Sequence, residues 1–151
     1  MIIIVDSREQ TPLSFPDGIQ TRVEGLPTGD YSIEGLTSHV ALERKSLEDL
    51  VSCITSSRER FEHELHRLQA YPCRAVLIEA GFSQIVGHRY RSKVSPASVT
   101  GSLAAWTIRY QIPFLFCGDP DGAAAMALSL MRNYIRIKSE EVKTFQKLME
   151  V

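Results

Sequence analysis

The sequence predicts an α/β fold in which helices flank both faces of a mixed central β-sheet, as a three-layer sandwich. Two features of the chain predict it. The first is a continuous β-branched run at residues 2–5, typical of a strand buried on both faces. The second is the alternation of apolar strands with amphipathic helices after residue 46. With 151 residues, 44% of them hydrophobic, the chain is long enough for one core, and we expect a single domain over residues 1–151.

The first half of the chain should contain a long loop, a hairpin and a helix. Residues 11–29 are rich in proline and glycine and are expected to be mostly loop. Residues 31–33 and 39–45 are expected to pair as a hairpin that turns near Gly35. The helix after Ser46, a favourable N-cap, carries apolar side chains at i, i+3, i+4 and i+7, namely Leu47, Leu50, Val51 and Ile54.

The second half should alternate helices with buried strands. A helix is expected at residues 57–70, and a strand at 75–78 follows it. A polar, basic segment at 81–96 leads to a helix at about 97–110 and a strand at 113–117. The chain should then finish with two helices, at about residues 119–137 and 140–149.

Composition and charge exclude several functional classes. The chain has 17 Lys and Arg against 18 Asp and Glu, which argues against a strongly basic, histone-like protein. Its three cysteines form no CxxC pair, as is typical of reduced thiols and not of a disulfide framework or zinc site. No apolar run is long enough to cross a membrane, and the apolar amino terminus is too short for a signal peptide. We therefore expect a soluble cytoplasmic protein, nucleoid-associated if it is prokaryotic.

The residues most informative about chemistry lie in the predicted hairpin. Side chains at i and i+2 of a strand share a face, so Glu43 and Lys45 should point the same way and Arg44 the opposite way. Asp30 begins the preceding strand, and a turn near Gly35 should return Glu43 and Lys45 to the end of the hairpin that holds Asp30. Two carboxylates and one lysine should therefore converge at one end of the sheet.

This arrangement has a specific chemical use. Two carboxylates can hold Mg²⁺ and leave coordination positions for water and a phosphate oxygen. An ammonium beside them can orient the attacking water and offset charge that develops on the phosphorus centre. Spacing alone favours another interpretation, a solvated hairpin in which Glu43 and Lys45 form a surface ion pair worth at most about 1 kcal/mol.

The residues around this hairpin favour the metal site over the surface ion pair. The string Gly29-Asp30-Tyr31, then Glu43-Arg44-Lys45-Ser46 and Asp49, resembles the GDX(n)ERKX3D motif of the XPF-type structure-specific endonucleases. Val5-Asp6-Ser7-Arg8-Glu9 is similar to the opening VDxRE element of that family, and residues 58–61 to its next block. The resemblance covers most of the chain and implies the restriction-endonuclease-like fold, with its PD-(D/E)XK site.

The resemblance also implies a role for each matching residue. Asp30 and Glu43 would bind the metal, Mg²⁺ or in its place Mn²⁺, and Lys45 would be the catalytic lysine. Asp6 would add a further acidic group at the metal. The supporting residues would be Arg44, Asp49 and Glu9, with Arg44 bracing Asp6 or Asp49 across the sheet. Asp49 and Glu9 can equally be ordinary surface acids.

One feature departs from the family pattern. Members that cut branched DNA usually continue into helix-hairpin-helix repeats, and some carry a helicase; neither fits after residue 140. We therefore expect a stand-alone nuclease domain whose preference for branched DNA is open. By analogy with the family, the helices at 119–149 can form a dimer face, so a homodimer or a separate targeting subunit is expected.

Two groups of basic residues are candidates for DNA contacts. Arg58 and Arg60 lie where a helix begins, and Arg89, Arg91 and Lys93 lie in the polar loop, where Tyr90 can stack on an unpaired base. A solvated surface loop explains the second group equally well.

We therefore expect a Mg²⁺-dependent DNA endonuclease that acts on branched or structured DNA in repair or recombination. One alternative is a catalytically inactive DNA-binding scaffold, although inactive relatives usually have eroded motifs and this motif is intact. A nucleotide-binding regulator is disfavoured because the chain has no Gly-rich phosphate loop.

Overall fold

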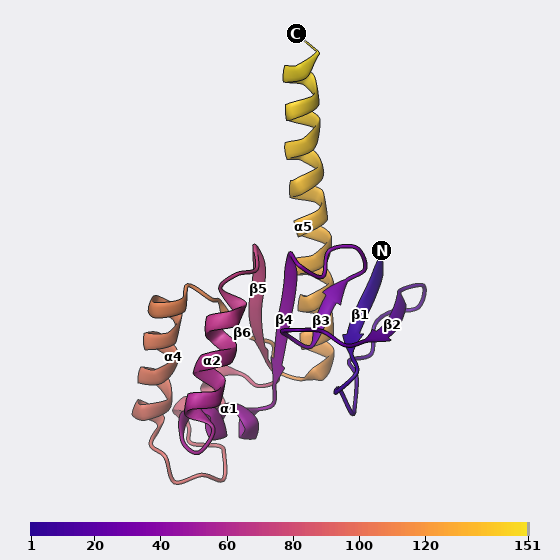
Figure 1. The fold of residues 1–151 in the computed structure, drawn as a ribbon. Coiled ribbons are helices and arrows are strands. Elements are labelled where there is room, and N and C mark those ends of the chain that lie inside the picture. The colour runs from indigo at the N-terminus through magenta and orange to yellow at the C-terminus, as the bar shows by residue number, and fades with distance from the viewer. Residues whose placement is uncertain (151) are drawn as a thin grey trace.

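The computed structural model describes residues 1–150, and it confirms the three-layer α/β architecture. A single six-stranded sheet has the strand order β2-β1-β3-β4-β5-β6. Helices α1, α2, α3 and α4 cover one face, and α5 crosses the other (Figure 1). The strands are β1 (Ile2–Asp6), β2 (Gln20–Glu24), β3 (Tyr31–Ile33), β4 (Val40–Lys45), β5 (Cys73–Ile78) and β6 (Phe114–Phe116).

The strand directions place several chain segments at one edge of the sheet. Strand β3 is antiparallel to both β1 and β4, whereas the β1–β2, β4–β5 and β5–β6 pairs are parallel. The carboxyl ends of β1, β4, β5 and β6 therefore meet at the same edge, where β3 begins. This edge holds Asp6, Asp30 and the Glu43–Lys45 segment.

Helices α1, α2 and α4 begin and end close to the expected positions. The helices are α1 (Leu47–Ile54), α2 (Arg58–Leu68), α3 (Phe82–Val86), α4 (Pro96–Tyr110) and α5 (Pro120–Met149). The side chains of Ser46, Ser95 and Asp119 cap α1, α4 and α5 by accepting a hydrogen bond from a backbone N–H in the first turn. No helix among residues 1–150 is long and apolar enough to span a membrane.

The core consists of two apolar clusters, one on each face of the sheet. Ala41 packs with the α1, α2 and α4 side chains, whereas Val40 and Leu42 pack with the Ala123–Met131 part of α5. This alternation along β4 continues to its end. It directs Glu43 and Lys45 toward the α1–α2 side and Arg44 toward the opposite side, as the sequence predicts.

Three elements differ from the sequence-based expectation. Strand β2 lies inside the expected loop; all five of its residues are exposed, so no apolar pattern marks it. The short helix α3 lies inside the expected polar segment. The two expected C-terminal helices are one continuous helix, because no glycine or proline interrupts residues 137–140. The ion pairs Arg136–Glu140 and Lys138–Glu141 also span the expected break.

Candidate active site

Asp30, just before β3, lies directly beside the end of β4. Gly29 has φ +79°, and a Cβ at this position would lie 3.2 Å from the backbone N and O of Leu42. Only glycine fits such a close approach without strain. The Asp30 N–H donates to Leu42 O at 2.8 Å, and the Arg44 N–H donates to Asp30 Oδ2 at 2.8 Å. These bonds fix the Asp30 carboxylate beside the Glu43–Lys45 segment.

Glu43 and Lys45 lie together on the α2 side of the sheet. Lys45 Nζ lies 3.1 Å from Glu43 Oε1 and 3.9 Å from Glu64 Oε2 of α2. The same ammonium lies 5.3 Å from the centre of the buried Phe61 ring, within the range of a cation–π contact. Glu43 is buried, with 8% of its surface exposed, so this is not the exposed surface pair that spacing alone favours.

A cleft of about 610 Å³ opens at this edge of the sheet. It brings together five residues that the sequence predicts, namely Asp6, Asp30, Glu43, Lys45 and Arg60. Three further charged residues that sequence reasoning missed also line it, namely Arg8, Glu64 and Arg67. For Glu64 and Arg67 the sequence signal is their i+4 and i+7 spacing from Arg60, which places the three residues on one face of α2.

Burial and mutual repulsion make the two central carboxylates costly to ionise. Burial raises the pKa of Glu43, and the neighbouring Asp30 raises it further. Burial also raises the pKa of Asp30, against the lowering effect of the Arg44 N–H. Burial disfavours the charged form of Lys45 and by itself would lower its pKa. The negative charges of Glu43 and Glu64 have the larger combined effect, so the pKa of Lys45 is raised. A cation bound between Asp30 and Glu43 would relieve the repulsion between them.

The donor set fits a divalent metal ion. No residue in the described range 1–150 donates a hydrogen bond to Asp30 Oδ1 or to Glu43 Oε2, so each carboxylate keeps an oxygen for a ligand. No group of three or more His, Cys, Asp or Glu within that range is arranged around one point as a closed metal site. Two carboxylates plus water and a phosphate are the ligands that Mg²⁺ usually takes at such a site.

Asp6 lies in the same cleft but is already engaged. Its Oδ1 accepts from the Leu26 N–H at 2.8 Å, and its Oδ2 accepts from Arg8 Nε at 2.7 Å. Burial opposes ionisation of Asp6, but these partners outweigh it and hold its pKa below the ordinary value. The role of Asp6 as a metal ligand stays a prediction, and Asp30 and Glu43 are the better-placed pair.

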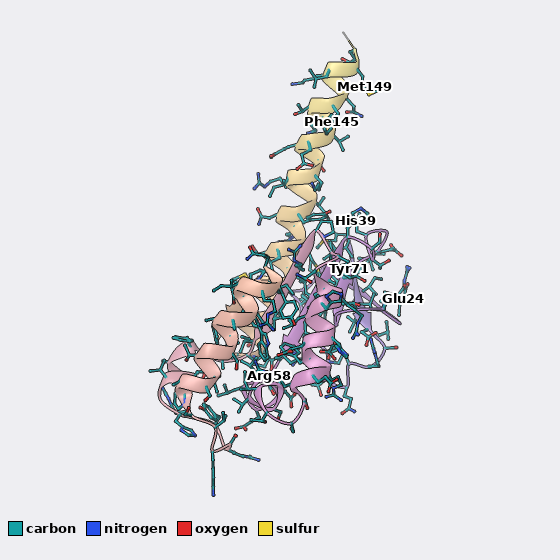
Figure 2. The ribbon with its side chains drawn as sticks, turned by 60° about the vertical axis from the view of Figure 1, so that its left-hand side comes forward. Glu24, His39, Arg58, Tyr71, Phe145 and Met149 are labelled. Atoms are coloured by element: carbon teal, nitrogen blue, oxygen red, sulfur yellow. The ribbon has the colours of Figure 1, made fainter. Side chains whose placement is uncertain are left out.

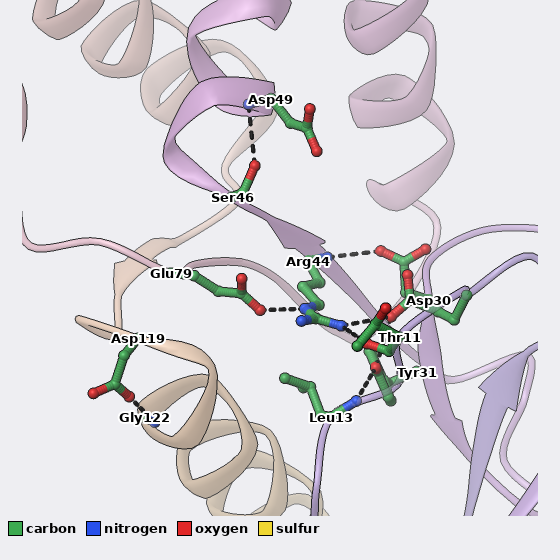
Figure 3. Close-up of polar contacts among 11 residues, drawn as sticks. Thr11, Leu13, Asp30, Tyr31, Arg44, Ser46, Asp49, Glu79, Asp119 and Gly122 are labelled. Atoms are coloured by element: carbon green, nitrogen blue, oxygen red, sulfur yellow. Dashed lines mark hydrogen bonds and ion pairs between the residues drawn. The ribbon is translucent and has the colours of Figure 1, made fainter. Parts of the chain in front are cut away.

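Arg44 anchors a separate ion-pair cluster on the opposite face of β4 (Figure 3). Its guanidinium bonds Glu79 and, at 3.1 Å, Glu9 Oε2. The Tyr31 hydroxyl donates to the same Glu9 oxygen at 2.7 Å. Arg44 and Glu9 thus contact each other directly, and their supporting roles stay predictions. The expectation that Arg44 braces Asp6 or Asp49 was wrong: Asp6 is bonded to Arg8, and the partner of Arg44 is Glu79, two residues after Leu77, with which Arg44 pairs in the sheet.

Asp49 is not part of the cleft. Its N–H donates to Ser46 Oγ at 3.2 Å, and its exposed side chain borders a separate hollow of about 260 Å³ beside Glu79. The structure therefore places Asp49 next to the Arg44 cluster and not beside Asp30 and Glu43.

The predicted DNA-contacting residues divide into two groups. Arg60 lines the cleft, whereas Arg58 is held elsewhere (Figure 2). Arg58 pairs with Glu62 at 2.9 Å, bonds Ser102 Oγ at 2.9 Å and covers the Trp106 ring, so it joins α2 to α4.

The loop that carries Arg89, Arg91 and Lys93 is exposed, and the Arg91 N–H donates to Glu48 at 3.1 Å, which ties the loop to α1. The expectation that Tyr90 stacks on a base was wrong: its ring is buried, and its hydroxyl donates to Val94 O.

The mixed sheet, with helices on both faces and an Asp–Glu–Lys group at one edge, defines a domain of the restriction-endonuclease-like fold. The ERCC4 domain model matches residues 5–130, and the chain therefore belongs to the ERCC4 domain family, as an XPF-type nuclease domain.

The chain is similar to the solved structure of XPF from Aeropyrum pernix, with 27% sequence identity and a TM-score of 0.70. The match covers 89% of this chain and 61% of that chain. The structure of the same XPF in complex with DNA matches equally well, over 89% of this chain and 65% of that one. The chain thus spans less than two thirds of the XPF chains it matches. No curated protein matches it at a significant level.

Proposed function

We propose that this chain is a divalent-metal-dependent DNA endonuclease that acts on branched or structured DNA in repair or recombination. The observation that carries the proposal is the Asp30–Glu43–Lys45 group, held at the sheet edge in an open cleft that also contains Arg60 and Arg67. Asp30 and Glu43 would hold Mg²⁺, or Mn²⁺ in its place. The ion would supply Lewis-acid activation of water and of the scissile phosphate.

The residues of the chain then have distinct tasks. Glu64 would remain as a partner of Lys45 if Glu43 held a cation, and the Lys45 ammonium would then be able to face the phosphate. There it would orient the attacking water by a hydrogen bond and offset the developing negative charge. Arg60 and Arg67 on α2 would hold phosphates that flank the scissile bond.

A DNA partner is supported by two observations. The XPF from Aeropyrum pernix, which this chain resembles, has been solved in complex with DNA. The chain itself carries exposed basic residues in the 87–95 loop, joined through Glu48 to the helix that follows Lys45. We propose that Arg89, Arg91 and Lys93 contact the sugar–phosphate backbone outside the cleft.

A panel of end-labelled flap, fork, junction, single-stranded and duplex DNA tests the proposal, with Mg²⁺, Mn²⁺ or a chelator. We expect cleavage of at least one branched substrate that needs the metal and is lost in Lys45→Ala. The alternative, an inactive scaffold, requires that the protein binds these DNAs and cuts none of them with either metal.

A further inference from the structure

Thr28 is a buried polar residue of the cleft whose hydroxyl forms no hydrogen bond within residues 1–150. Only 8% of its surface is exposed. Three other polar or charged residues in that range are at least as deeply buried, and each has a side-chain partner: Asp6 and Ser32 in hydrogen bonds, and Glu43 in an ion pair. The Thr28 hydroxyl is therefore the exception among the buried polar groups that the structure describes.

The segment that carries Thr28 is fixed at both ends. The Leu26 N–H donates to Asp6 Oδ1 at 2.8 Å, which ties the segment to the end of β1. Asp30 is bonded to β4 at the other end (Figure 3). Between these points Pro27 has a restricted backbone, and the β-branched side chain of Thr28 has few rotamers. The hydroxyl is thus held in a narrow range of positions in the cleft.

Packing does not account for this hydroxyl. Threonine is found mostly at exposed positions, and burial of a hydroxyl without a hydrogen bond costs free energy. Valine has nearly the same shape and would fill the position without that cost. A ligand that enters the cleft and accepts a hydrogen bond explains why the position holds threonine.

The other donors of the cleft indicate which ligand this is. Arg60 and Arg67 line the cleft from α2, and Lys45 lines it from β4. Arginine and lysine side chains are the usual donors to phosphate oxygens. The geometry points to the Thr28 hydroxyl as a further, neutral donor, to a phosphate oxygen of DNA from the β1 side of the cleft. This inference rests on the proposed function, because it takes DNA as the ligand.

A neutral donor differs from the arginines in its response to salt. A phosphate contact by a cationic side chain releases counterions, so it steepens the slope of log K against log salt. A hydroxyl carries no charge, and its contact raises the affinity by the same factor at every salt concentration. A hydrogen bond to a charged oxygen corresponds to about tenfold in affinity.

Fluorescence titrations of the branched DNA that the wild type binds best test this contact, with Ca²⁺ present and the DNA shown by gel to remain uncut. Thr28→Val should weaken binding about tenfold at each salt concentration and leave the slope unchanged. Thr28→Ser keeps the hydroxyl and should bind within about threefold of the wild type. Thr21→Val makes the same change at an exposed position on β2 and should bind like the wild type.

Two measurements without DNA separate this contact from other roles of Thr28. Thermal unfolding should show a Tm for Thr28→Val equal to or above that of the wild type, because the variant buries no unpartnered hydroxyl. A lower Tm would assign the hydroxyl to the stability of the fold. Binding of Mn²⁺, followed by electron paramagnetic resonance, should be the same in both proteins. Weaker Mn²⁺ binding by Thr28→Val would make Thr28 a metal ligand. Either result would overturn the phosphate contact.

The DNA titrations also separate this inference from the proposed function. Equal affinities of Thr28→Val and the wild type, or a changed salt slope, would overturn the contact and leave the endonuclease proposal standing. A wild type that binds DNA, loses affinity in Thr28→Val and cuts no DNA with Mg²⁺ or Mn²⁺ would support the contact and remove the endonuclease activity. A wild type that binds no DNA would overturn both.

Discussion

The main-chain N–H of Arg44 donates a hydrogen bond of 2.8 Å to Oδ2 of Asp30. Arg44 lies between Glu43 and Lys45 in β4. The bond therefore fixes the position of Asp30 relative to both of these residues. The Arg44 side chain points the other way, into the cluster with Glu9 and Glu79. One residue thus positions the site with its backbone and stabilises the fold with its side chain.

Replacing Arg44 should therefore destabilise the fold strongly. Arg44→Ala leaves Glu9 and Glu79 partly buried without their cation, which should lower the free energy of unfolding by about 3 kcal/mol. Arg22→Ala removes an arginine that is half exposed and pairs with Glu24 and Glu34, and should cost less than about 1 kcal/mol. Urea unfolding of both variants measures the difference; equal losses would contradict the structural role of Arg44.

Glu64 should matter for turnover more than for DNA binding. Glu64 would be the partner left to Lys45 if Glu43 held a cation, so Glu64→Gln should lower kcat by about tenfold and leave KM nearly unchanged. Glu64→Asp should recover part of the rate. Glu59→Gln removes an exposed carboxylate on the same helix and should cleave like the wild type. A rise in KM at constant kcat would instead assign Glu64 to DNA binding.

The two arginines of the cleft should govern salt-dependent DNA binding. Arg60→Ala with Arg67→Ala should weaken binding and reduce the slope of log K against log salt by about one unit per arginine. Arg58→Ala should leave this slope unchanged and lower the free energy of unfolding by roughly 1 kcal/mol, because Arg58 joins α2 to α4. Fluorescence titrations at several salt concentrations measure the slopes. Identical slopes in the wild type and the double variant would remove the arginines from the interface.

The carboxylate of Glu43 should make the metal-free protein less stable as the pH rises. Its pKa in the folded state is raised, so the folded protein holds this proton more tightly than the unfolded chain does. The resulting stability is present below the ordinary glutamate pKa and is lost as the pH rises toward the raised value. Glu43→Gln does not titrate.

The free energy of unfolding of Glu43→Gln should therefore exceed that of the wild type by a margin that grows between pH 5 and pH 8, by at most about 1.4 kcal/mol per pH unit. Thermal unfolding with chelator across this range measures the margin. A constant or shrinking margin contradicts the raised pKa. Glu59→Gln, at an exposed position, is the matched control and should show no such trend.

The arrangement of Asp30, Glu43 and Lys45 could be predicted because the alternation of side chains along a strand is a local property, whereas their assignment as a site came from the family resemblance. The alternation placed Glu43 and Lys45 on one face and Arg44 on the other, and the hairpin brought Asp30 to the same edge. The apolar runs likewise indicated β1, β4 and β5. Signals of this kind are local, so a single sequence contains them.

The parts that could not be predicted depend on contacts between distant segments. Glu79 lies 35 residues from Arg44, and only the parallel pairing of β4 with β5 brings them together. Arg60, Glu64 and Arg67 share a helical face, but the packing of α2 beside the end of β4 decides that this face lines the cleft. Strand β2 pairs with β1 through its backbone, and all its side chains are exposed, so they contain no strand signal.

The rate of DNA cleavage by Glu43→Gln, measured at saturating Mg²⁺ on the substrate that the wild type cuts best, tests the central claim most directly. The substitution keeps the size of the side chain and removes one of the two carboxylates that would hold the ion. We expect cleavage to fall by about a thousandfold or more, while DNA affinity and the circular dichroism spectrum stay those of the wild type. Cleavage by Glu43→Gln at the wild-type rate would contradict the assignment of Asp30, Glu43 and Lys45 as the active site.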